Sequence, residues 1–193
     1  IRLRAMAAAG KLHDAATLEA QIRRMLADPK SEALVQNFVA QWLHLRLLEN
    51  VAPDPEVFPG FDNELKAAMR RETQLFAAAV IREDRSILDF LSGRFTFVNE
   101  RLAKHYGLAG AFGSEFSRVN FEDNRRTGVL TQASILTLTS NPGRTSPVKR
   151  GKWILENVLG SPPPDPPANV PDLESIQKAK PDATLREQLD IHR

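Results

Sequence analysis

The clearest candidate for chemistry in this chain is a basic stretch that leads into the start of a helix. No acidic residue stands between Asp123 and Glu156. The unpaired backbone N–H groups and the positive dipole end of a helix N-terminus favour an anion, and arginine adds a bidentate donor. We therefore predict a site for a carboxylate, phosphate or sulfate group. Its candidate ligands are Asn141, Arg144, Thr145, Ser146, Lys149 and Arg150. Arg125, Arg126 and Lys152 complete the basic residues of the stretch.

The same residues also have a purely structural interpretation. Ser146 can cap its own helix, and Arg144 can pair with Glu72 or with a backbone carbonyl group. Glu72 falls on the apolar stripe of an expected helix, where an ionised carboxylate needs a partner. We expect that partner to be an arginine, and Glu72 and Arg101 are the candidates for a structural ion pair. The sequence leaves the binding and structural alternatives open.

The chain offers few histidine or cysteine side chains that could bind a metal ion or a haem. The chain has no cysteine, which excludes disulfides, thiolate metal sites and covalent haem attachment within these residues. His44 has no histidine or carboxylate three or four positions later, so no metal site is predicted. His105 stands at an expected helix end, where an imidazole can satisfy a carbonyl group, bind a ligand or respond to pH.

Composition and known catalytic patterns narrow the possible functions. The formal charge of +2 is too small to indicate a nucleic-acid partner, and no apolar run is long enough to span a bilayer. Nucleophile-elbow, Walker and dinucleotide glycine patterns are missing, so nothing predicts catalysis by this segment alone. With 42% apolar and 26% charged residues, the chain has the balance of a globular protein.

The elements that would position these residues are mostly helical. Caps and apolar spacing predict helices after Asp14 and Ser31, from Asp62 to about Glu83, and at 86–91, 99–106, 127–139 and 146–160. Residues 135–139 would also suit a strand. Residues 116–121 allow a short strand, and the prolines of 161–171 favour a stiff strap. The predicted fold is mainly α: a multi-helix globular bundle with long loops, at most a short β hairpin and a proline-rich C-terminal strap.

Several longer motifs resemble known families. The DUF1592 family is resembled by Ala40-Gln41-Trp42-Leu43, Met69-Arg70-Arg71-Glu72-Thr73, Phe97-Val98-Asn99-Glu100-Arg101-Leu102, His105-Tyr106-Gly107 and Gly128-Val129-Leu130-Thr131-Gln132-Ala133-Ser134. Residues 140–142 and 144–153 resemble the start of the DUF1588 family, and residues 1–30 resemble the end of a DUF1595 module. The resemblance thus divides the chain into 1–30, a helical core at 31–139, and 140–193 with a linker at 161–171.

The resemblance also implies a context for the chain. Such modules occur in large secreted proteins of planctomycetes and related bacteria, often beside cytochrome c-like domains. We therefore expect a periplasmic or extracellular segment of a longer protein, with other domains of that protein as partners. In similar sequences a Cys-x-x-Cys-His motif follows a segment like residues 185–193. Any c-type haem is accordingly expected in adjoining sequence and not within this chain.

Three functions are compatible with these features. The first is a non-catalytic helical module that packs against and positions neighbouring domains of an exported, haem-containing redox protein. The second is an enzyme or carbohydrate-binding module for an anionic extracellular substrate, with Arg144, Ser146, Lys149 and Arg150 as the anion ligands. The third is a structural spacer.

Overall fold

The computed structural model describes residues 2–123, 125–164, 184 and 186–187, whose regular secondary structure is helical apart from one small sheet. The α-helices are α1 (Arg2–Ala8), α2 (Ala15–Leu26), α3 (Glu32–Leu34), α4 (Ala40–Trp42), α5 (Asn63–Arg82), α6 (Asp89–Ser92), α7 (Glu100–Tyr106), α8 (Ala133–Leu138) and α9 (Pro147–Asn157). Shorter helical turns are η1 (Lys11–His13), η2 (Pro29–Ser31), η3 (Val35–Val39), η4 (Leu45–Asn50) and η5 (Val129–Thr131). The mainly α prediction is therefore confirmed. Most of the expected strap at 161–171, and of the helix expected near 185–189, lies outside the described residues.

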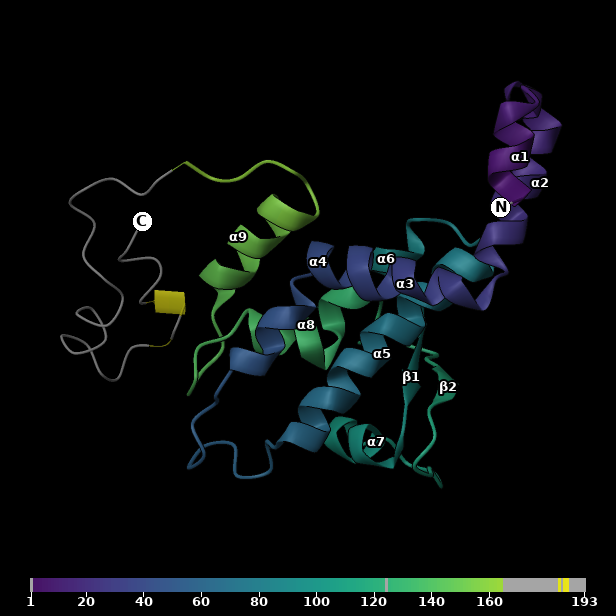
Figure 1. Cartoon of the computed structure of the whole chain (residues 1–193). Coiled ribbons are helices and arrows are strands. Elements are labelled where there is room, and N and C mark those ends of the chain that lie inside the picture. The colour runs from purple at the N-terminus through teal and green to yellow at the C-terminus, as the bar shows by residue number, and fades with distance from the viewer. Residues whose placement is uncertain (1, 124, 165–183, 185, 188–193) are drawn as a thin grey trace.

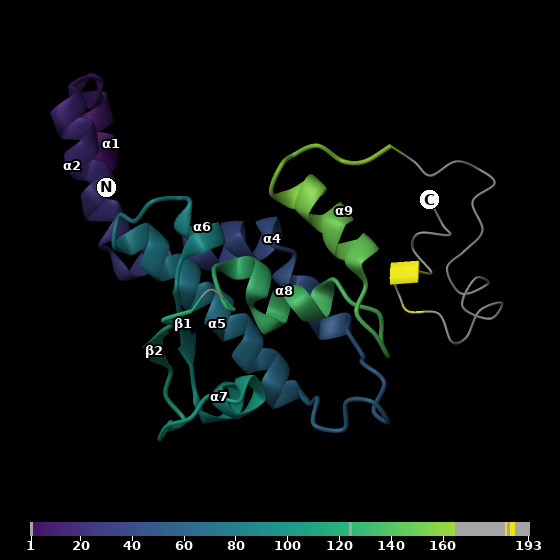
Figure 2. The same ribbon diagram turned by 180° about the vertical axis from the view of Figure 1, so that it is seen from behind.

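Helix α5 lies at the centre of the body of the protein (Figures 1 and 2). It begins where predicted, because the Asp62 carboxylate accepts a hydrogen bond of 2.7 Å from the backbone N–H of Leu65. Leu65, Met69 and Phe76 are buried along its length. The sheet and α7 pack on one side of α5 and α8 on another, so α5 has little contact with solvent along its middle turns.

The sheet has two antiparallel strands, β1 (Phe95–Val98) and β2 (Ser117–Asn120). Phe95 pairs with Asn120 and Val98 with Ser117, and α7 lies in the connection between the strands. The short strand expected near 116–121 is confirmed as β2. Strand β1 was not predicted, because its four residues are nearly all buried and show no alternation between an apolar and a polar face.

The core consists of two clusters that meet along α5. One contains stacked aromatic rings, with the centroids of Phe76 and Phe95 4.8 Å apart and an edge contact of 5.2 Å between Trp42 and Phe90. The other gathers Met69, Leu102 and their neighbours between α5 and α7. Trp42 also ties α9 to the body, since its indole N–H donates a 2.6 Å hydrogen bond to the carbonyl of Asn157.

The region after Asp28 differs from expectation. The Asp28 carboxylate, and not Ser31, caps the first turn, and the helix from Glu32 to Trp42 contains the π-helical turn η3. This turn changes the helical phase, so that Val35 and Val39 are buried while Phe38 remains 59% exposed. The apolar face is consequently narrower than the sequence suggested.

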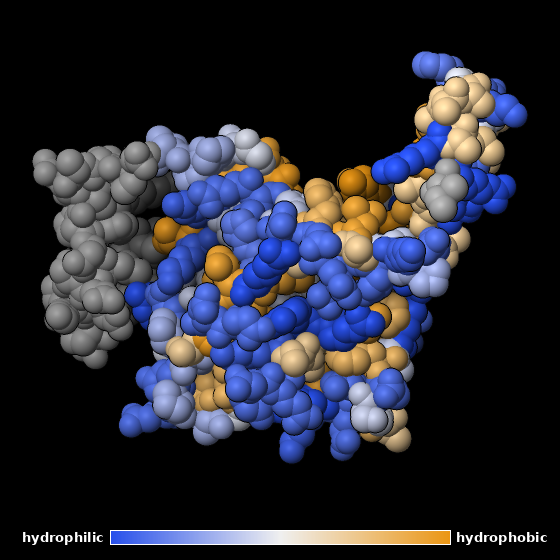
Figure 3. Space-filling model, in the orientation of Figure 1, coloured by the Kyte–Doolittle hydropathy of each residue, from blue (hydrophilic) through white to orange (hydrophobic). Residues whose placement is uncertain are grey.

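Helices α1 and α2 form an arm that stands away from the body (Figures 1 and 2). Asp14 caps α2 as predicted, by accepting a hydrogen bond of 2.8 Å from Thr17. The apolar face of α2 is not covered by the body, and Leu18, Ile22 and Met25 are 42–48% exposed. Apolar side chains gather on the surface where the arm meets the body (Figure 3). No helix among the described residues is long and apolar enough to cross a membrane.

Gly128 fixes the approach of the 126–131 turn to α6. Its φ is +55°, and its N–H donates a 2.8 Å hydrogen bond to the carbonyl of Gly93. An added Cβ would lie 2.3 Å from the carbonyl oxygen of Phe90, closer than any real contact. Only glycine fits this position, and the turn that carries Arg126 depends on it.

We predict that Gly128→Ala destabilises the protein by about 2–4 kcal/mol, because the methyl group adds a backbone clash to a strained φ. Gly151→Ala is the matched control. Gly151 lies inside α9 with no heavy atom near an added Cβ. Alanine there should raise the free energy of unfolding by about 0.5–1 kcal/mol. Urea unfolding of both variants checks the prediction, and equal midpoints would contradict it.

Candidate functional site

The segment predicted to bind an anion forms a tight turn before α9. The backbone N–H of Asn141 donates to the carbonyl of Arg144 at 2.8 Å, and Ser140 and Thr145 form an isolated antiparallel bridge. Ser146 then caps α9, because its hydroxyl oxygen accepts a 3.3 Å hydrogen bond from the backbone N–H of Lys149. Ser146 is thus occupied by its own helix.

This turn borders a cavity of about 580 Å³, which we call the arginine cleft. The cleft lies between the 50–61 loop, the end of α7, α8 and the 140–145 turn. Its polar lining comes from Asn50, His105, Tyr106, Arg126, Thr137, Ser140, Asn141, Arg144, Thr145 and Arg150. Its apolar lining comes from Val51, Ala52, Pro53, Phe58, Phe61, Met69, Ala133, Leu136 and Pro142. Four of the six predicted anion ligands line the cleft, whereas Ser146 and Lys149 do not.

No carboxylate lies within ion-pairing distance of Arg126, Arg144 or Arg150 in the part of the chain that the structure describes. Arg126 donates to the carbonyl of Thr131 at 3.1 Å. Arg150 donates to two threonine hydroxyls at 3.2 and 3.3 Å. The Arg144 side chain makes no hydrogen bond with another described residue. The cleft therefore concentrates positive charge beside an apolar wall.

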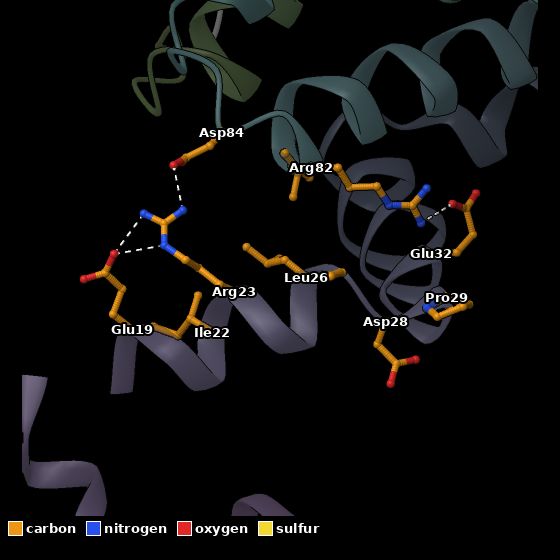
Figure 4. A pocket seen from close by; sticks show the side chains of 11 residues that line it. Glu19, Ile22, Arg23, Leu26, Asp28, Pro29, Glu32, Arg82 and Asp84 are labelled. Atoms are coloured by element: carbon orange, nitrogen blue, oxygen red, sulfur yellow. Dashed lines mark hydrogen bonds and ion pairs between the residues drawn. The ribbon is translucent and has the colours of Figure 1, made fainter. Parts of the chain in front are cut away.

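A second hollow, of about 610 Å³, lies between α2 and the end of α5 and has the opposite character. Its arginines are paired: Arg23 contacts Glu19 at 2.9 Å and Asp84 at 3.2 Å, and Arg82 contacts Glu32 at 3.0 Å (Figure 4). Local carboxylates already balance these charges. The arginine cleft is accordingly the better candidate for an anion site.

His105 lies in the cleft lining near the end of α7. Partial burial lowers the pKa of its imidazole, and the positive charges of Arg101 and Arg126 lower it further. The imidazole is therefore mainly neutral near pH 7. Its role as a ligand or pH-sensitive group stays a prediction. The described residues contain no cluster of histidine and carboxylate side chains able to hold a metal ion.

The expected ion pair between Glu72 and an arginine is wrong. One carboxylate oxygen of Glu72 accepts a 2.6 Å hydrogen bond from the Thr96 hydroxyl, and the other accepts one of 2.6 Å from Tyr106. Arg101 instead pairs with Asp62 at 3.0 Å. The reason is distance along α5, since Asp62 and Glu72 are ten residues, or roughly 15 Å, apart on that helix.

Tyr106 links this buried carboxylate to the cleft. Its hydroxyl donates to Glu72 and accepts a 2.8 Å hydrogen bond from the backbone N–H of Ala133 at the start of α8. The guanidinium of Arg126 lies over its ring, 3.9 Å from the centroid. Tyr106 therefore has its hydroxyl in the core and its ring in the wall of the cleft. Sequence reasoning noticed Tyr106 only as part of a motif and missed Thr96.

Burial is the main cause of the shifted pKa values of Glu72 and Tyr106. Desolvation raises the pKa of Glu72 to about 7, against the opposing effects of its two hydrogen bonds and of Arg126. The pKa of Tyr106 rises well above its usual value of 10.0, through burial and the nearby negative charge of Glu72. The phenol thus stays protonated and remains the donor of the pair.

Comparison with known families gives matches to two of the families that the sequence resembles. Residues 1–108 match the PSD4 model, described as a protein of unknown function (DUF1592). The chain belongs to the DUF1592 family. Residues 126–193 match the PSCyt3 model, described as a protein of unknown function (DUF1588). Neither a curated protein nor a solved structure gives a significant match.

Residues from both matched segments line the arginine cleft. His105 and Tyr106 come from the DUF1592 match, whereas Arg126, Arg144 and Arg150 come from the DUF1588 match. The DUF1592 match also contains residues 1–30. Our predicted boundaries at 30/31 and 139/140 stay predictions. The arginines therefore depend on packing between the two matched segments for their position.

We predict that Glu72 makes this DUF1592 protein less stable as pH rises. A carboxyl whose pKa is about 7 when folded and about 4.5 when unfolded binds its proton more tightly in the folded state. Its contribution is fully present below about pH 4.5 and is lost as pH rises through 7, on the order of 3 kcal/mol in total. Glu72→Gln should remove this loss and be more stable than the wild type at pH 8.

Urea unfolding between pH 4.5 and 8 measures this effect. The exposed Glu64 in the first turn of α5 offers the control, since Glu64→Gln should leave the wild-type pH profile unchanged. Parallel profiles for the wild type and Glu72→Gln would contradict the assigned role of Glu72.

Proposed function

We propose that the chain is a non-catalytic binding module of a larger exported, haem-containing redox protein. In this proposal the arginine cleft holds a carboxylate, or a similar oxyanion, of a neighbouring domain of the same protein and thereby positions that domain. The observation that carries the proposal is the convergence of Arg126, Arg144 and Arg150 on one cleft, with no carboxylate of the described residues within ion-pairing distance.

The chemistry of the cleft supports an anion with an apolar body. A guanidinium group binds a carboxylate through two parallel hydrogen bonds and loses less hydration than an ammonium group. Three like charges around one cavity repel one another, and a bound anion relieves this repulsion. Phe58, Phe61 and Leu136 offer apolar surface that a small inorganic ion would leave uncovered.

The proposed context rests on the family resemblance. Modules of this kind occur beside cytochrome c-like domains, and we propose a periplasmic or extracellular location for this one. A haem propionate combines a carboxylate with a large apolar ring, which is the combination that the cleft lining favours. Because this chain has no cysteine, a c-type haem would be held by another domain.

The size of the cleft favours a second candidate, binding of an anionic extracellular substrate. A volume of about 580 Å³ lies within the range of small-molecule sites. The ligand set then differs from the predicted one, with Arg126 in place of Ser146 and Lys149. A free acid that binds without any neighbouring domain would favour this candidate.

We predict that Arg144→Ala weakens oxyanion binding at least tenfold, whereas Lys149→Ala changes it less than twofold. Both variants lose one positive charge from the same segment, but only Arg144 lines the cleft. Arg144→Ala should also keep the wild-type melting temperature, because its guanidinium makes no hydrogen bond within the described structure. Calorimetric titration with sulfate, phosphate, benzoate and galacturonate at constant ionic strength measures the affinities.

The series separates the possible outcomes. Benzoate binding tighter than sulfate would support the role of the apolar wall. Equal losses in the two variants would indicate nonspecific attraction to the basic segment, and no binding of any acid by the wild type would contradict the proposed site.

A further inference from the structure

A small chamber of about 10 Å³ lies beneath the arginine cleft, next to the buried carboxylate. Glu72, Thr96, Tyr106, Arg126 and Gln132 contribute to its lining. Tyr106 and Arg126 line the cleft as well, so this pair separates the chamber from the cleft. The volume is close to that of a single water-sized sphere.

Gln132 is the unexplained residue of this chamber. It is only 3% exposed, and neither Nε2 nor Oε1 of its amide has a hydrogen-bond partner in the described structure. Gln132 stands at the N-cap of α8, yet its side chain accepts no hydrogen bond from that helix. A buried amide without partners is costly, and native structures normally satisfy both of its atoms with protein or water.

We propose that the chamber binds one water molecule, which connects the amide of Gln132 to the carboxylate of Glu72. A water molecule suits these groups because it can accept from Nε2 while donating to Oε1 and to a carboxylate oxygen. The assignment of the two amide atoms does not affect this argument, since water can donate and accept on either side. The proposal is independent of any ligand in the cleft.

The electrostatics of the chamber favour water over a cation. Among the described residues, Glu72 is the one carboxylate that lines it, and the guanidinium of Arg126 adds a positive charge to the same wall. Both carboxylate oxygens of Glu72 already accept one hydrogen bond each, and each oxygen retains capacity for another. Water can also serve Glu72 in its neutral state by accepting a hydrogen bond from the carboxyl O–H group.

Magnetic relaxation dispersion of water ¹⁷O, which counts long-lived internal waters, tests the proposal. We expect Gln132→Met to contain one such water fewer than the wild type, because methionine has a similar length but no amide. Gln21→Met is the control. Gln21 is also buried, but its Oε1 accepts a 3.0 Å hydrogen bond from Arg24, so its replacement should leave the count unchanged.

A second measurement needs no variant and therefore remains decisive if Gln132→Met fails to fold. In the wild type, the side-chain amide protons of Gln132 should show a nuclear Overhauser effect to a water resonance. Absence of this effect, or an unchanged count in Gln132→Met, would overturn the proposal. A Gln132 amide signal that shifts on exchanging Na⁺ for K⁺ at constant ionic strength would overturn it in favour of a bound cation.

Discussion

The buried carboxylate of Glu72 is the constraint on which the arrangement of this protein depends. A buried carboxyl group in the middle of α5 must be given hydrogen bonds, and they come from Thr96 on β1 and Tyr106 on α7. Tyr106 then accepts from Ala133, which fixes the start of α8. One carboxylate thereby aligns the sheet, two helices and the wall of the arginine cleft. Tyr106 thus connects the hydrogen bonds of this carboxyl group to the lining of the cleft.

The distribution of arginines follows from the same core. Several guanidinium groups elsewhere pair with carboxylates, as Arg23 and Arg82 do at the base of the arm and Arg101 does at the start of α5. Around the cleft the chain places arginines from the DUF1588 match against a wall from the DUF1592 match. What sets Arg126, Arg144 and Arg150 apart is that all three line one cleft, and this shared lining is the basis of the proposed ligand or partner.

Local signals made much of this structure predictable. Asp14, Asp62 and Ser146 each mark a helix start, because a cap depends only on residues within one turn. The charge of the basic segment drew attention to residues 140–150, whose binding of an anion stays a prediction, and the predicted capping by Ser146 is confirmed. Contacts between segments that are distant in the sequence could not be predicted from such local signals. The partners of Glu72 lie 24 and 34 residues further along the chain, and apolar spacing cannot select Thr96 or Tyr106 over an arginine.

The most direct test of the cleft follows the arginine Nε–Hε resonances by NMR while benzoate is added at constant ionic strength. Resonances of Arg126, Arg144 and Arg150 should shift together with one dissociation constant, because the three groups surround the same ligand. Those of Arg23 and Arg82, already paired with carboxylates, should remain in place. Uniform small shifts of all arginine resonances, or no shift at the three cleft arginines, would contradict a specific anion site in the cleft.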